Sequence, residues 1–350
     1  MKKIHALLLV FLLGSCATTI KNFDKYEKQF MSKSAFMPSA ENLEGKSPKV
    51  VVFAFEENDN EIAKNAALGK TIANNVESIL TKDRLIELVD RSAAEKLKKE
   101  ILVVEANKTG SYKGPKIADY AISGAISNAD FTSKYSSGST YVNPKNMQVV
   151  SIPPKYTYNS SVAGNIKIYE LPSLTVVENI DFSGSQGRSE NVRQNGGLSL
   201  GGLQVGGQQV DGISRDDGLV RKAGEDAIDE VKSTLKNAFA KKGYILEKRT
   251  YDNKAIFKIT LGSQDGIKQD DEFEVIGQFE VENAISGATE VERRNIATGK
   301  VADQIHAKTA WVVINEKEKA SAIRLGDAVK IKYKKNQLES LMKTATKLAI

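Results

Sequence analysis

The sequence predicts an α/β (α+β) sandwich with two long hairpin-like inserts, followed by a small antiparallel β-barrel. Apolar runs of strand length alternate with helix-spaced patterns over residues 48–245. Two segments rich in Ser, Tyr, Asn and Gly, 128–160 and 184–218, interrupt this alternation and are the predicted inserts. Short alternating strands separated by turns fill residues 250–335, which is typical of a small barrel.

The alternation begins with a continuous apolar run at 49–55, which favours a strand buried on both faces. Apolar residues then recur at helical spacing and predict a helix over about 63–81. A second strand follows at 85–89. Ser92-Ala93-Ala94-Glu95 is a capping box that opens another helix, and 118–126 is a third strand. This order of elements predicts a sheet with crossover helices.

A hairpin and a long helix complete this first domain. Residues 162–170 and 175–182 alternate in polarity on either side of Pro172-Ser173, which predicts two antiparallel strands. Apolar residues from Leu219 to Ala238 recur at helical spacing and predict a helix to about Lys242, closed by Gly243. Asp216-Asp217 precede this helix, where negative charge suits the helix dipole.

The predicted C-terminal barrel contains two stretches that echo one another, 266–275 and 323–331. Each reads as a turn, an Asp and an alternating strand. Strands at 255–261, 297–305 and 309–315 would complete the barrel. The tail, 336–350, predicts a short helix.

The N-terminus predicts a signal peptide over residues 1–15. A positive start precedes an apolar run, Ile4 to Leu13, that is too short to span a bilayer as a helix. Leu13-Gly14-Ser15-Cys16 follows, with the only cysteine of the chain, and resembles a bacterial lipobox. This resemblance implies cleavage before Cys16 and acylation of that residue. Ala17 follows Cys16 where an Asp commonly retains lipoproteins in the inner membrane, so the resemblance also implies that the protein is anchored in the outer membrane. We expect the polar segment 16–47 to be a lipidated tether.

Several kinds of chemistry are disfavoured by composition. The net charge of +6 is mild and no basic face is concentrated, so we expect no nucleic-acid partner. Gly69-Lys70-Thr71 lacks the glycine that a phosphate loop needs at position 64, so we expect no nucleotide. His306 is the only histidine outside the signal segment, and no acid/base pair is well placed. We therefore predict that the chain is not an enzyme and that it binds no metal and no cofactor other than the lipid attached to Cys16.

Residues 49–55, 86–91 and 118–126 resemble the CsgG/HfaB family of curli secretion channels, as does the predicted hairpin of Ile166–Leu171 and Glu178–Ile180. Pro172-Ser173-Leu174 stands where that family has a Thr-Gly turn. TolB-like N-terminal domains and the LpoB activators of peptidoglycan synthases share the same core. The C-terminal domain is similar to the SH3-like domain of the flagellar protein FlgT.

In curli-type channels two hairpins per subunit join those of other subunits as one outer-membrane barrel, and the two inserts fall at those places. The resemblance implies membrane hairpins there, and a spanning strand needs about 9–11 residues. In the second insert, Gly201-Gly202 is predicted to be a bulge that brings two short alternations into phase. The candidate membrane-hairpin residues are Tyr135, Tyr141, Tyr156, Tyr158, Leu198, Leu200, Leu203 and Val205.

These features predict a non-enzymatic, lipid-anchored outer-membrane protein that lies mainly in the periplasm. It would form a homo-oligomeric pore or an envelope assembly or secretion component, with a secreted cargo or an envelope protein as partner. The alternative is a periplasm-facing adaptor that regulates an envelope machine such as a peptidoglycan synthase or the flagellar base. The two functions differ in whether 128–160 and 184–218 are embedded in lipid.

Overall fold

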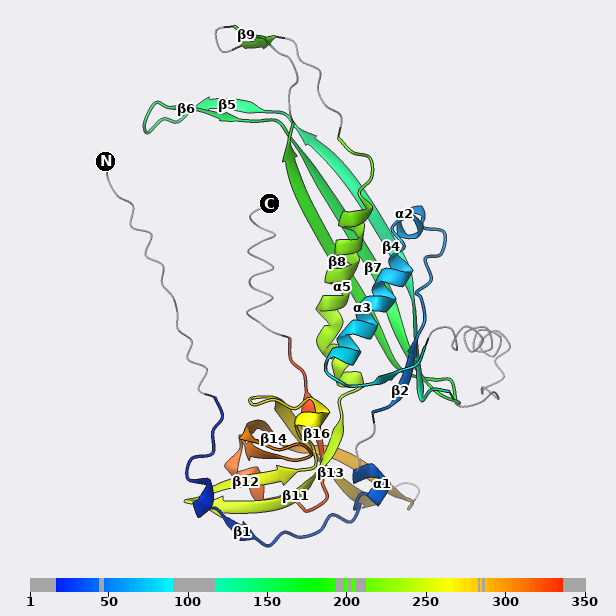
Figure 1. Ribbon diagram of the computed structural model, residues 1–350, viewed down its shortest axis with the longest axis vertical. Helices are drawn as coiled ribbons and strands as arrows, with labels where there is room; N and C mark the ends of the chain where they lie inside the picture. Colours follow the sequence, from blue (N-terminus) through cyan, green and yellow to red (C-terminus); the bar gives the residue numbers. More distant parts are fainter. Residues whose placement is uncertain are drawn as a thin grey trace. The chain divides into compact units, whose positions relative to one another are not determined.

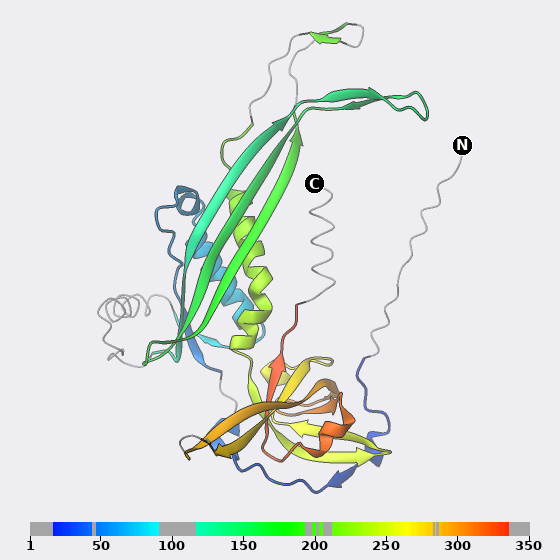
Figure 2. The ribbon, with the colours of Figure 1, turned by 180° about the vertical axis from the view of Figure 1, so that it is seen from behind.

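The computed structural model describes residues 17–43, 47–90, 117–192, 198–200, 203–205, 212–282, 284 and 287–335. It is mostly β with few helices, and it divides into two compact units. One unit comprises Met1–Lys46 and Lys241–Lys332, and the other comprises Ser47–Ala240 and Tyr333–Ile350 (Figures 1 and 2). The predicted signal peptide with Cys16, the helix predicted to open at Ser92 and the predicted tail helix lie outside the described residues.

The unit Ser47–Ala240 is built on a five-stranded sheet in the order β3-β2-β4-β7-β8. Strand β2 runs parallel to β3 and β4, whereas β4, β7 and β8 are antiparallel to their neighbours. The strands are β2 Lys49–Val52, β3 Glu87–Leu88, β4 Tyr120–Ser136, β7 Lys155–Glu170 and β8 Thr175–Asn191. The predicted hairpin around Pro172-Ser173 is confirmed as β7 and β8.

Helices α3 and α5 lie on the same face of this sheet (Figures 1 and 2). The helices of this unit are α2 Glu61–Asn65, α3 Leu68–Lys82 and α5 Asp217–Ala238. The core between the layers is aliphatic and includes Ile72, Val76, Ile166, Ala227 and Ile228. The predicted order of strand, helix and strand is found at β2, α3 and β3. Helix α5 confirms the predicted long helix but ends at Ala238, and Lys242, its predicted end, is in a strand.

The two predicted inserts are not separate hairpins that leave the sheet. Strands β4 and β7 continue through much of 128–160, and β8 continues to Asn191. The segment 184–191, which belongs to the second predicted insert, pairs residue by residue with β7. Ser and Gly have weak strand propensity, but pairing with β7 on one side and packing of α5 on one face outweigh it.

The other unit contains a closed six-stranded antiparallel barrel, which confirms the predicted small barrel. Its strand order is β11-β12-β15-β14-β13-β16, and β16 pairs with β11 to close it. The strands are β11 Lys242–Tyr251, β12 Lys254–Ile259, β13 Glu272–Glu282, β14 Thr289–Ile305, β15 Ala310–Ile314 and β16 Ala328–Lys332. Phe257, Phe273 and Val312 are fully buried in this unit.

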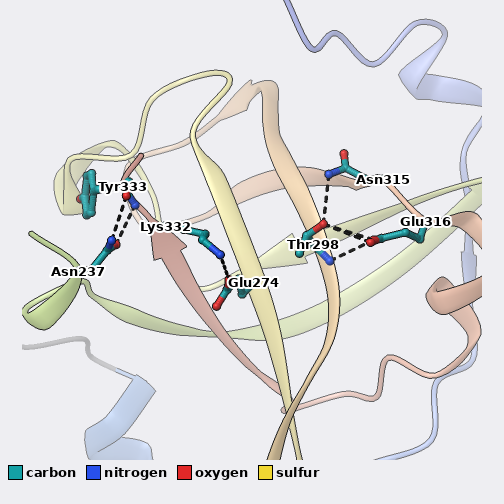
Figure 3. A network of polar contacts seen from close by, with 7 residues as sticks. All are labelled: Asn237, Glu274, Thr298, Asn315, Glu316, Lys332 and Tyr333. Atoms are coloured by element: carbon teal, nitrogen blue, oxygen red, sulfur yellow. Dashed lines mark hydrogen bonds and ion pairs between the residues drawn. The ribbon is translucent and has the colours of Figure 1, made fainter. Parts of the chain in front are cut away.

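Polar pairs tie neighbouring elements at several points (Figure 3). The Lys332 ammonium of β16 bonds to the Glu274 carboxylate of β13, and Thr298 N–H of β14 donates to Glu316 at 3.2 Å. In the sheet unit, the Asn237 side chain donates to Tyr333 C=O at 2.9 Å and accepts from Tyr333 N–H at 2.8 Å. Residue 333 is thereby fixed to the end of α5.

The segment Ala17–Leu43, predicted to be a tether, is packed on the barrel instead. Strand β1, Glu27–Gln29, pairs antiparallel with β11, and a 3₁₀ turn, Phe23–Lys25, precedes it. Ile20 and Tyr26 are buried in a cluster with Trp311, and the Phe23 ring meets the Trp311 ring edge-on at 5.3 Å. Ile20, Phe23 and Tyr26, spaced three residues apart, supply this packing. The segment was predicted to be a tether because its average composition is polar.

Candidate functional site

The long strands of the sheet extend past the helices that cover them. Strands β4 and β8 have 17 residues each and would reach about 55 Å at ~3.3 Å per residue. Helix α5 has 22 residues and reaches about 33 Å at 1.5 Å per residue. Both ribbon views show the far ends of β4, β7 and β8 beyond α5 (Figures 1 and 2). We call this part, residues 127–136, 155–163 and 183–191, the β-arm.

The face of the β-arm that continues the helix side carries a row of aromatic rings. Phe131 and Tyr158 are stacked with centroids 6.1 Å apart, as are Tyr158 and Tyr156. Tyr135 meets Tyr156 at 5.2 Å. Tyr158 is only 2% exposed, and its hydroxyl accepts a hydrogen bond from Ile213 N–H at 3.3 Å. The row is therefore an extension of the core that stiffens the arm.

Arg188 connects the β-arm to the start of α5. Its guanidinium lies 4.8 Å from the Tyr158 ring centre and donates to Asp216 at 2.9 Å. Asp216 is the N-cap of α5 and accepts from Leu219 N–H at 2.9 Å. Burial raises the pKa of Asp216, but hydrogen bonds from Leu219 N–H and Arg188 outweigh it, so this pKa lies below its usual value. The negative charge expected before α5 is thus a cap.

We expect Asp216→Ala to lower the free energy of unfolding by about 1–2 kcal/mol, because it removes the N-cap oxygen. Asp216→Asn keeps a capping oxygen and loses only the charge, so its cost is ~0–1 kcal/mol. Because the pKa of Asp216 is lower in the folded state, its ionised carboxylate stabilises the fold at pH values above the unfolded-state pKa of about 3.9. This stabilisation is lost as the pH falls through the folded-state pKa. Urea unfolding across pH should therefore show the gap between wild type and Asp216→Asn closing below about pH 4.

The opposite face of the β-arm carries short polar side chains. The strand alternation puts on this face Thr132, Thr157, Asn159, Ser161, Ser185 and Ser189. Thr157 and Ser189 join β7 to β8 by a hydroxyl–hydroxyl bond of 3.2 Å. A strand that faces lipid needs an outward apolar band. This face does not have one, so it suits water or another polar surface.

Both edges of the β-arm lack a strand partner in the described part of the chain. Strand β4 has β2 beside it only as far as Ile122, with one further bridge between Glu56 and Ala125. Strand β8 pairs with β7 and with no other described strand. Its segment 183–191 contains no Pro or Lys, the residues that commonly protect exposed edges. On the β4 edge, Asn60 Nδ2 donates to Ala129 C=O at 3.0 Å, and Lys134 lies further along the strand. The β8 edge, and the β4 edge beyond Ala129, can accept a further strand.

A short hairpin, β5 Ser139–Val142 and β6 Val149–Ile152, follows the end of β4 and precedes β7. Apolar side chains are exposed on it, among them Tyr141, Val142, Met147 (76% exposed) and Val149 (68% exposed). Pro153-Pro154 separate it from β7, since proline gives no ladder hydrogen bond. Its four-residue strands reach about 13 Å, under half of the ~30 Å of a bilayer core. The hairpin is long enough to touch an apolar surface and too short to cross a bilayer.

The glycine-rich stretch forms a second, smaller strand pair, β9 Leu198–Leu200 and β10 Leu203–Val205. Leu200 pairs directly with Leu203, and Leu198 with Val205. The bulge predicted at Gly201-Gly202 lies outside the described residues. Strands of three residues fall well short of the about 9–11 that span a membrane.

The candidate residues from the sequence thus fall in different places. Tyr135, Tyr156 and Tyr158 come together in the aromatic row, where Tyr158 is a core residue and does not face outward. Tyr141 lies apart from them on the exposed β5/β6 hairpin. Leu198, Leu200, Leu203 and Val205 are paired in β9 and β10. The contacts of Arg188 with Tyr158 and Asp216 were not predicted from the sequence.

Among the described residues, no group of three or more His, Cys, Asp or Glu is placed to hold a metal ion. No helix in the described ranges is both long and apolar enough to cross a membrane. That the protein has no cofactor and no enzymatic activity remains a prediction from the sequence.

No protein-family model matches the chain, and no curated protein matches it. Among solved structures, a PelC dodecamer from Paraburkholderia phytofirmans is similar to it, with 11% sequence identity. The likeness covers 46% of this chain and 80% of the PelC chain, at a TM-score of 0.21. A score this low supports no conclusion about a shared fold or function. The resemblance to the curli channel family stays a prediction.

Proposed function

We propose that this chain is a non-enzymatic lipoprotein of the outer membrane that associates with copies of itself through the β-arm, as an envelope assembly or secretion component. The lipobox-like end of the signal segment supports the anchor and its location. The observation that carries the proposal is that the arm segments of β4 and β8 each have one edge without a strand partner among the described residues. An exposed strand edge is a ready-made template for pairing with another chain.

The two edges lie on opposite sides of the arm and run in the same direction, because β4 and β8 are both antiparallel to β7. Pairing β8 of one copy with β4 of the next would use two different surfaces. Such a contact repeats from copy to copy and ends in a closed ring or an open filament. A secretion or assembly component built in this way needs no catalytic residue.

Proline substitution on β8 tests this assembly. In an antiparallel strand, consecutive backbone N–H groups point alternately to the two sides. Of Ser185→Pro and Gln186→Pro, one variant therefore removes a bond to β7 and the other disturbs only the free edge. The variant that keeps the wild-type unfolding transition is the edge variant, and we expect it to remain monomeric by light scattering where the wild type assembles.

Unchanged assembly of that folded variant would rule out the β8 edge as the contact. The other proline variant is the matched control, since it carries the same substitution one residue away and should lose stability. This comparison separates a failure to assemble from a failure to fold.

The β5/β6 hairpin favours a second function, that of an adaptor. Its exposed apolar residues and its short reach suit a partner protein as well as a membrane surface. A monomeric, lipid-anchored chain would then bring this hairpin to an envelope machine. The state of assembly of the intact protein decides between the two functions.

A further inference from the structure

The barrel unit contains a cavity of about 480 Å³, within the ~300–1,000 Å³ of small-molecule sites. Its walls come from the N-terminal segment, from β12 and β15 and from the turn that contains Ala320. The apolar part of the lining includes Ile20, Ala255, Ile256, Val313, Ile314 and Ala320. Four of these six, Ile20, Ile256, Ile314 and Ala320, are buried. An apolar interior of this size suits a hydrocarbon group.

The cavity also has a polar rim. Lys21 and Lys254 line it and are exposed, and Thr18, Thr19 and Asn253 contribute further polar atoms. An apolar interior with a polar, positively charged rim matches an amphiphile. Its chain would lie inside, and its polar end would stay near water or lipid headgroups.

The first described residues of the chain form part of this wall and are fixed to the barrel. Thr18 N–H donates to Asp270 at 2.8 Å, and the Gln269 amide donates to Thr18 C=O at 3.0 Å. Ile20 N–H donates to Asp303 at 3.0 Å. The hydrogen bonds from Thr18 also hold the pKa of Asp270 below its usual value, so this clamp is intact at neutral pH.

Ala17 lines the cavity, and Cys16 is its neighbour in the sequence. Consecutive Cα atoms lie about 3.8 Å apart, so a chain attached to residue 16 begins beside the cavity wall. A group carried on a flexible tether would not begin at such a defined place.

We propose that the cavity holds one acyl chain of the lipid attached to Cys16. This inference rests on the lipidation that is part of the proposed function. The cavity would shield one hydrocarbon chain from water and keep the barrel against the membrane that holds the others. Lys21 and Lys254 would then face the headgroups of the same membrane.

Trp311 is the natural reporter, because it is the only tryptophan of the chain and packs in one cluster with Ile20 and Ile256 of the cavity wall. The probe is dibromostearic acid, whose bromine atoms quench tryptophan at short range. The mature chain from residue 16 with Cys16→Ala has no acyl chain. We expect saturable quenching of Trp311 in this protein, and absence of saturable quenching would overturn the cavity as an acyl site.

A variant that fills the cavity provides a further test. Val313 pairs with Ile256 in the cluster that contains Trp311, so Val313→Phe should occupy the cavity and raise the Kd for the probe by about tenfold or more. Ala288→Phe is the matched control, because it adds a ring at an exposed position that does not line the cavity, and it should leave the Kd unchanged. Equal binding by Val313→Phe and Ala288→Phe would place the probe elsewhere and contradict the proposal.

The source of the acyl chain is tested by repeating the quenching measurement on the lipidated wild type, with both proteins in one mild detergent. We expect no saturable quenching, because the protein's own acyl chain occupies the cavity. Binding as tight as that of the Cys16→Ala protein would show a cavity that takes lipid from outside and would overturn the assignment to Cys16. Mass spectrometry of the wild type reports the acylation separately, so a failure of the proposed anchor is distinguishable from a failure of the cavity.

Discussion

Gly184→Ala should lower the free energy of unfolding by about 1–3 kcal/mol, although it adds a single methyl group. A Cβ at residue 184 would lie 2.3 Å from Ala227 N, 2.5 Å from Ala223 C=O oxygen and 2.7 Å from Ala227 Cα. All three are backbone atoms of α5, which cannot rotate away as a side chain can. The helix must shift off β8, and the core beneath it loses contact. Urea or thermal unfolding of the purified protein measures the loss.

The matched control is Gly187→Ala, three residues further along the same strand. Its Cβ would lie on the other face, 2.8 Å from the Asn159 side-chain oxygen, which can move. Glycine inside a strand costs roughly 0.5–1 kcal/mol relative to alanine, so this change should be neutral or slightly stabilising. Equal effects of the two substitutions would contradict the close packing of α5 on β8.

Tyr158→Ala should cost about 3–5 kcal/mol, because a large buried ring is removed from the middle of the aromatic row. The variant also loses the ring beneath Arg188 and the stacking against Phe131 and Tyr156. We expect the far part of the β-arm to open before the helix-covered part of the sheet. Hydrogen exchange of residues 127–136 and 155–163 would show this as faster exchange at unchanged protection of β2.

Tyr158→Phe is the control for the hydroxyl group alone. It keeps the ring and removes the acceptor of the Ile213 N–H bond, so we expect a loss of about 1 kcal/mol. If Tyr158→Ala were as mild as Tyr158→Phe, the aromatic row would not be what stiffens the arm.

The elements that could be predicted from the sequence have strong periodicity. The α5 helix shows apolar residues from Leu219 to Ala238 at a steady helical spacing, and the β7/β8 hairpin alternates on both sides of a proline turn. The barrel strands are short, alternating and bounded by turns. In each of these elements the local pattern agrees with the tertiary environment, so the pattern predicts the correct secondary structure.

Other features depended on partners that are distant in the sequence. Strand β8 continues through the Ser and Gly of 183–191 because β7 is already beside it, and neither composition nor periodicity signals this. The docking of Ala17–Leu43 depends on Ile20, Phe23 and Tyr26 meeting Trp311 nearly 300 residues away. The role of Arg188 depends on Asp216 and Tyr158, which lie on other elements. Such contacts follow from the fold and are not visible in a local stretch.

Self-association of the protein is tested by the mass of the lipidated, full-length chain in mild detergent. Light scattering measures this mass over a range of protein concentrations, and electron microscopy shows the shape of the particles. Self-association through the β-arm predicts a discrete mass of several subunits and closed rings or regular filaments in the images. A single-subunit mass at every concentration would contradict the assembly and would leave the adaptor function in its place.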